Sequence, residues 1–188
     1  MKCSRLPAVL AVLALSAFAS RIAAQETPAL MVPTKEHKEM AREVGVWDAE
    51  ASLRVTPDAE PVTSKGVETV TKVGEFWLVG VFEGEMMGQP FRGQSQTTYD
   101  PLKKKYVGTW IDSMAPTLNT LEGDYDAATH TLTMMMTGVD PMTAKPMKWK
   151  TVTRYEGDDA KTFEMHLPVE GQEGKWWKSF EIKYKRRK

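Results

Sequence analysis

The chain has 188 residues, in which 25 lysines and arginines balance 25 aspartates and glutamates. A chain without a basic excess has no electrostatic support for binding nucleic acid or an anionic membrane surface. The length suits one domain that buries a substantial hydrophobic core.

The first residues have the layout of a secretory signal peptide. Lys2 and Arg5 precede an apolar run over residues 6–20, and the small residue Ala24 offers a cleavage site. The run is too short for a comfortable membrane span, which needs about 20 residues; an uncleaved anchor is the alternative. We therefore expect a signal peptide at residues 1–24 and export to the periplasm or the cell exterior.

Cleavage after Ala24 changes what the mature chain can do. It removes Lys2, Arg5, Arg21 and no acidic residue, which leaves a net charge of −3. It also removes Cys3, the only cysteine. Disulfides, zinc–thiolate sites and cysteine nucleophiles are thereby excluded, so the mature domain must be stabilised by packing.

A lead-in segment at residues 25–33 precedes a predicted short helix at residues 34–45. Thr34 suits the N-cap and Gly45 suits the stop. Four residues with helical spacing share one face: His37, Met40, Ala41 and Val44. A helix this short is not stable alone, so we expect it to pack on the rest of the domain.

From Trp47 onward the pattern alternates with a period of two, which is typical of β-strands. Short turns containing glycine, proline or aspartate separate the runs, as in antiparallel hairpins. We predict ten strands near residues 47–55, 64–73, 75–85, 91–100, 104–112, 117–126, 130–138, 148–157, 161–169 and 176–186. Such a series fits a β-sandwich or a barrel, and its up-and-down rhythm favours the barrel. The prediction is one all-β domain at residues 34–188, an up-and-down antiparallel barrel with an N-terminal plug helix.

Several segments resemble a known family. They are His37-x-x-Met40, Gly45-x-Trp47, GQPFRGQSQTTYDPLKKKYVGTWIDSM, GDYD and the closing EIKYKR. Together, from His37 to Arg186, they are similar to domain-of-unknown-function family 1579. Met40 stands where leucine is usual, a volume-conserving change. The resemblance implies a lipocalin-like fold and no established activity.

The Gly-x-Trp after a plug helix is also similar to the lipocalin signature. There the indole closes the narrow end of the barrel and a basic residue of the last strand stacks on it. The resemblance implies that Gly45, Trp47 and Arg186 form the barrel floor, with Lys185 as the alternative basic residue. A cation–π contact would hold the indole in place.

A barrel of this size can enclose one small ligand. Alternation places several aromatic and methionine side chains on faces that would point inward, although a register slip would invert them. The candidate ligand-binding residues are Tyr106, Trp110, Asp112, Leu132, Met134, Met136 and Phe180. Such a wall suits an apolar ligand. The alternative is that these side chains fill the barrel and no ligand exists.

The sequence predicts no metal and no cofactor. The methionines, with a run at 134–136, would suit Cu(I), but they lack a repeated M-x-x-M spacing and serve equally as packing residues. The three histidines lack local ligand spacing: we expect His37 half-buried against the barrel, His130 in a turn and His166 on an outer face.

Catalytic motifs are also missing, since the chain has no G-x-S-x-G, H-E-x-x-H or phosphate-binding glycine loop. Asp112 is the acidic residue that could serve in catalysis, because a carboxyl group in an apolar cavity can act as an acid or base. The alternative is that Asp112 caps the turn that follows it.

A structural or protein-binding barrel of the cell envelope is a third hypothesis. Under each of these hypotheses, we expect the protein to be a monomer or a homodimer.

Overall fold

The computed structural model describes residues 28–140 and 143–188. The predicted signal peptide and the first three residues of the predicted lead-in, 25–27, lie outside the described residues. Within the described ranges, no helix has the length and apolar character needed to cross a membrane.

The α-helix within residues 34–44, which we call the plug segment, is shorter than the sequence predicts. After a 3-10 turn, η1 (Ala29–Met31), the helix α1 covers Lys35–Met40 and continues as the 3-10 turn η2 (Ala41–Glu43). His37 fixes the start of α1, because its Nδ1 accepts a hydrogen bond from the backbone N–H of Thr34 at 3.1 Å. His37 and Met40 are buried, whereas Val44 is exposed.

Ten strands follow, as the alternation predicts. They are β1 (Gly45–Leu53), β2 (Val62–Val73), β3 (Trp77–Met86), β4 (Gln89–Asp100), β5 (Lys105–Asp112), β6 (Ala115–Asp126), β7 (Thr131–Val139), β8 (Pro146–Glu156), β9 (Ala160–Pro168) and β10 (Trp176–Arg186). Each strand pairs antiparallel with its neighbours in sequence. Connections this short exclude parallel pairing of consecutive strands, which needs a crossover of about a dozen residues or more.

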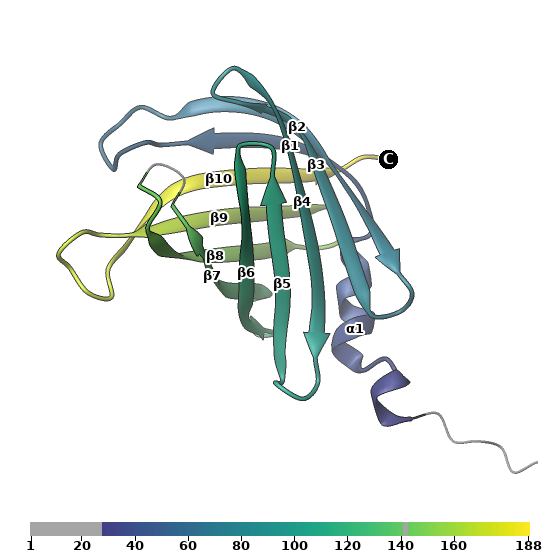
Figure 1. The fold of residues 1–188 in the computed structure, drawn as a ribbon. Coiled ribbons are helices and arrows are strands. Elements are labelled where there is room, and N and C mark those ends of the chain that lie inside the picture. Colours follow the sequence, from purple (N-terminus) through teal and green to yellow (C-terminus); the bar gives the residue numbers. More distant parts are fainter. Residues whose placement is uncertain (1–27, 141–142) are drawn as a thin grey trace, which may run out of the picture.

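The sheet closes on itself because β1 also pairs with β10, in a register that runs from Trp47↔Arg186 to Leu53↔Phe180. The predicted up-and-down barrel with an N-terminal plug helix is therefore confirmed. Figure 1 shows α1 at one end of the barrel, beside the β2–β3 hairpin, and β4–β6 running across the direction of β8–β10. We call the end at α1 the floor and the opposite end the mouth.

Burial differs between the two ends. Near the floor, Trp47 and Ala49 of β1 are 2% exposed, and Tyr184 of β10 is also buried. One apolar cluster joins these side chains to Tyr106 and Met134 on the far wall. The core therefore lies inside the barrel, and it is most tightly packed next to the plug segment.

Candidate functional site: the barrel interior

The strand register places one row of inward-facing residues across four neighbouring strands. Gly80 pairs with Ser95, Ser95 pairs with Trp110, and Trp110 pairs with Asn119. Side chains of paired residues lie on the same face of a sheet. This row places Trp110 between the smaller side chains of Ser95 and Asn119 on the inner wall.

Six of the seven predicted ligand-binding residues lie on the inner face of the barrel, between the floor and the mouth. Tyr106, Trp110, Leu132, Met134 and Phe180 all belong to the one apolar cluster. Another predicted residue, Met136, alternates with the outward Met135 on β7, and its side chain is only 9% exposed. The register therefore brings this set to one surface, from strands on both sides of the barrel.

Trp110 is positioned by a glycine on the neighbouring strand. Its ring lies directly over Gly93, where a Cβ atom would overlap the indole. The ring of Phe91 stacks beside it, with centroids 6.4 Å apart, and Phe82 meets Phe91 edge-on at 5.9 Å. Aromatic pairs in these geometries stabilise each other beyond their area of burial. They form a flat aromatic wall on β3–β5.

Asp112 lies at the mouth and makes two hydrogen bonds. Its Oδ2 accepts one from Nε1 of Trp110 at 2.9 Å, and its Oδ1 accepts one from the backbone N–H of Met114 at 2.9 Å. The second bond caps the β5–β6 turn. Within the described residues, its hydrogen-bond partners include neither a tyrosine nor a histidine, so this carboxylate positions the indole and the turn.

Several inward-facing side chains are only partly buried. In the described part of the chain, no large side chain has less than 2% of its surface exposed. Phe91, Trp110, Leu132, Phe163 and Phe180 face inward and yet are only partly buried. These side chains are therefore accessible on the inner face of the barrel. We call the inner surface that they line the lumen, and it is the candidate site.

The floor is built around Trp47. Its Nε1 donates a hydrogen bond to the carbonyl of Glu43 at 2.8 Å, and the guanidinium carbon of Arg186 lies 4.1 Å from the ring centroid. Arg186 also donates to the carbonyls of Val44 at 2.7 Å and Arg42 at 2.6 Å. Gly45 leaves room for this guanidinium, because a Cβ there would lie 2.6 Å from it. Lys185 is exposed on the outer face.

Sequence reasoning missed a buried charged cluster just above the floor. Lys161 of β9 is 6% exposed and pairs with Glu43 of the plug segment and, at 3.1 Å, with Glu68 of β2. Burial opposes the charge on Lys161, but the two carboxylates outweigh it and raise the pKa of the ammonium group. Its Nζ also lies 4.7 Å from the ring centroids of both Trp47 and Tyr184.

Four tyrosines form a second group at the floor end. Neighbouring rings meet edge-on in the order Tyr99, Tyr106, Tyr125, Tyr155, with centroids 5.2–6.3 Å apart. The guanidinium of Arg42 covers the last two, 4.9 and 4.5 Å from their centroids. Burial, followed by the charge of Glu39, raises the pKa of Tyr106 to about 12. This hydroxyl is therefore neutral at ordinary pH.

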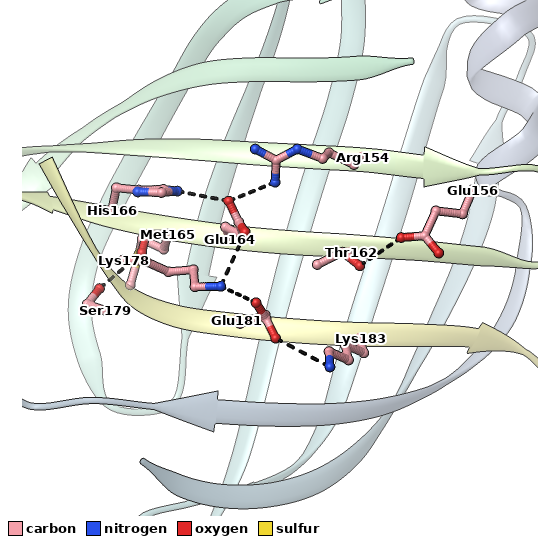
Figure 2. A network of polar contacts seen from close by, with 10 residues as sticks. All are labelled: Arg154, Glu156, Thr162, Glu164, Met165, His166, Lys178, Ser179, Glu181 and Lys183. Carbon is pink, nitrogen blue, oxygen red and sulfur yellow. Dashed lines mark hydrogen bonds and ion pairs between the residues drawn. The ribbon is translucent and has the colours of Figure 1, made fainter. Parts of the chain in front are cut away.

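The three histidines belong to three different parts of the structure. His37 starts the helix, His130 lies in the β6–β7 turn, and His166 belongs to an outer network on β8–β10 that Figure 2 shows. In that network Glu164 accepts from His166 at 3.0 Å and from Arg154 at 2.8 Å. Among the described residues, no group of three or more histidine, cysteine, aspartate or glutamate side chains is placed to hold a metal ion.

The fold is a closed, ten-stranded antiparallel barrel with a short helix at one end, and aromatic and methionine side chains line its inner face. The chain belongs to the family described as "Protein of unknown function (DUF1579)", whose model matches residues 32–186. The resemblance found in the sequence is thereby confirmed.

Solved structures support the same fold. The crystal structure of Rv2717c from M. tuberculosis aligns with a TM-score of 0.62 at 13% identity, over 82% of this chain and 99% of that one. The S-type phycobiliprotein lyase CPES from Guillardia theta aligns with a TM-score of 0.52 at 14% identity, over 83% and 99%. Both are similar in fold to this chain. No curated protein matches it in sequence.

Proposed function

We propose that this is an exported, non-catalytic protein that binds a small, mainly apolar ligand in the lumen. The observation that carries the proposal is the partial exposure of inward-facing aromatic side chains in a closed barrel. Ligand sites are typically concave, mostly apolar and lined by a few oriented polar groups. Trp110, held over Gly93 and fixed by Asp112, supplies a flat apolar surface of this kind.

Export is part of the proposal and rests on the leader at residues 1–24. One experiment addresses both parts. The full chain is expressed with its leader, recovered from the exported fraction, and measured by native and denaturing mass spectrometry. We expect a chain that begins at Gln25 and a native mass that exceeds it by one small molecule. An unprocessed chain in the cytoplasm would contradict export.

Nile red, a neutral apolar dye, tests the lumen directly. Leu132 faces inward on β7, and Met135 faces outward on the same strand with 36% of its surface exposed. Leu132→Trp fills the lumen, so it should weaken dye binding by about tenfold or more, whereas Met135→Trp should leave it unchanged. Equal dye binding by both variants, at equal thermal stability, would overturn the lumen as the binding site.

A further inference from the structure

The outer surface of the barrel differs between its two sides. On β8–β10 it carries the charged network of Figure 2, in which Glu164 lies between Arg154 and Lys178. On β3 and β5, where the alternate side chains Leu78 and Tyr106 face inward and are buried, the outward side chains in the middle of the wall carry no charge. They are Trp77, Val79 and Val81 on β3, and Val107, Thr109 and Ile111 on β5.

The strand between them, β4, is polar but also uncharged over the same length. Its outward side chains are Gln94, Gln96 and Thr98, and Gln96 pairs with Val79 on one side and with Thr109 on the other. Two strands with mainly apolar outward residues therefore flank one strand with amide and hydroxyl groups. We call this outer surface of β3–β5 the uncharged face.

Large apolar side chains on the uncharged face are open to solvent. Trp77 is 41% exposed and Ile111 is 47% exposed, and the neighbouring strand β6 adds Leu118, which is 58% exposed. The central parts of protein–protein interfaces are depleted in charged residues and enriched in aromatic ones, and an exposed apolar surface of this kind marks an interaction site. The uncharged face therefore suits another protein surface that is also free of charge at its centre.

Charged residues at the two ends of β4 indicate which protein this is. Arg92 lies at the mouth end and Asp100 at the floor end, each four positions from Gln96, and the Arg92 side chain is 68% exposed. A two-fold axis that lies in the interface, runs across the strands and passes Gln96 lays β4 of one copy antiparallel on β4 of the other. Arg92 then lies over Asp100 of the partner subunit, and the symmetry forms this contact twice. The face thus complements a second copy of itself in charge.

The same axis matches the apolar strands. It lays β3 on β3 and β5 on β5, so that Trp77 lies over Val81 of the partner subunit and Ile111 over Val107 of the partner subunit. The glutamine amides of β4 meet at the centre, where they can donate and accept hydrogen bonds. Sheets that pack in this way lie about 10 Å apart, with strands aligned to within about 30°.

The extent of the face suits a dimer. It is roughly 27 Å long from Arg92 to Asp100 and, with β2 and β6 included, about 20 Å wide. Interfaces that bury about 800 Å² on each partner have this extent.

We propose that the uncharged face binds a second copy of this chain, giving a two-fold dimer with Gln96 at the axis and Arg92 paired with Asp100 of the partner subunit. The outward side chains are short, so the dimer forms at micromolar concentrations and dissociates below about 1 µM. The lumen lies on the opposite side of the sheet, so this inference goes beyond the proposed function and does not depend on a ligand.

Sedimentation equilibrium of the mature protein between about 1 and 200 µM tests the association, and we expect the mass to rise from one chain toward two. Gln96→Arg, at an exposed position, brings two guanidinium groups together at the axis and should weaken the dimer by about a hundredfold or more. Thr133→Arg, exposed on the outer face of β7 and outside the uncharged face, is the matched control and should leave the dimer unchanged. Thermal unfolding at about 1 µM should be the same for both variants.

A charge exchange tests the arrangement of the two copies. Arg92→Asp and Asp100→Arg each place like charges together in a homodimer, so each variant alone should dimerise about tenfold more weakly. An equimolar mixture should recover dimerisation, because each variant then meets the opposite charge at both contacts. Asp100 also accepts hydrogen bonds from the backbone N–H groups of Leu102 and Lys103, at 2.9 and 3.1 Å. Damage to that turn would not be repaired by mixing, so recovery reports on the interface.

Three results would overturn the proposal. One is a chain that is still monomeric at about 200 µM, which would leave the face to a different partner or to none. Another is a dimer that Gln96→Arg does not weaken, since the interface would then lie elsewhere. The third is a mixture of the two charge variants that dimerises no better than either variant alone.

Discussion

Glu164 shows how the outer face of the barrel is stabilised by charge. Its side chain is 12% exposed and lies between Arg154, His166 and Lys178 (Figure 2). Burial acts to raise the pKa of this carboxyl group, but hydrogen bonds from Arg154 and His166 outweigh burial and lower it to about 2. Glu164 therefore stabilises the fold in its ionised form.

The pH dependence follows from the direction of that shift. A carboxyl group with a lowered pKa in the folded state stabilises it above its ordinary value, 4.5 here, and this stability is lost as the pH falls toward 2. Glu164→Gln should lower the free energy of unfolding by about 1–2 kcal/mol near neutral pH, allowing for solvent screening, and by progressively less in acid. Urea unfolding across this range measures it, with Glu60→Gln in the exposed β1–β2 loop as control. A deficit that is the same at every pH would contradict the assignment.

Two single residues could have indicated the buried charged cluster, although the alternation pattern did not take them into account. Lys161 shares its strand face with Phe163 and Met165, and Glu68 shares its face with Val70. A charged residue on the apolar face of a strand is a signal of a buried partner. The sequence could not identify the partners themselves, because Lys161 and Glu43 are 118 positions apart in the chain and meet only once the barrel closes.

At the scale of elements, the plug segment is attached to the barrel by a set of polar contacts and by Met40, which belongs to the apolar core cluster. Glu43 binds Lys161 through its carboxylate and Trp47 through its carbonyl. The carbonyls of Arg42 and Val44 accept from Arg186. His37 adds edge-on contacts with Phe76, at 5.2 Å, and Tyr99, at 6.0 Å. A helix of this length depends on such contacts for its stability.

Lys161→Met should therefore loosen the plug segment and weaken the whole fold. It leaves Glu43 and Glu68 buried without their shared cation, and breaking a buried ion pair in this way costs about 3–5 kcal/mol. Hydrogen exchange should show the greatest loss of protection at residues 34–44, and urea unfolding gives the total. Lys185→Met, at an exposed position on β10, should change stability by less than about 0.5 kcal/mol. Equal effects of the two substitutions would show that the cluster does not hold the plug.

For the molecule as a whole, closure of the barrel at β1 and β10 is the decisive feature. The backbone N–H of Arg54 donates to Ser179 at 2.8 Å, and that of Arg187 donates to the carbonyl of Val46 at 2.8 Å. Backbone groups alternate in direction along a strand, so the N–H of Glu50 also points toward β10. In an open sheet that group would face solvent.

Proline at position 50 tests closure, because it removes that N–H. Glu50→Pro should lower the free energy of unfolding by about 3 kcal/mol or more, as expected for a central strand. Glu50→Ala, which keeps the N–H at the same exposed position, should cost less than about 1 kcal/mol. Denaturant unfolding compares the two. A proline that is tolerated as well as alanine would mean that β1 is an edge strand.

The architecture could be predicted because its determinants are local. Period-two runs separated by short turns leave a meander of neighbouring hairpins as the only simple topology, and the ten predicted strands are all present. The bulge between Trp110 and Asp112 could not be predicted in this way, since a bulge reflects the pairing of two strands. For the same reason, the contact of the Trp110 ring with Gly93 requires the register of β4 and β5 and is not visible in any one segment.

The last strand ends beside the plug segment, since Arg186 pairs with Trp47 and Arg187 bonds to Val46. The mouth lies at the far end of the molecule (Figure 1). A linker attached after Lys188 would thus tether the protein to a sensor chip by its sealed base, leaving the opening turned to the bulk solution where candidate molecules arrive.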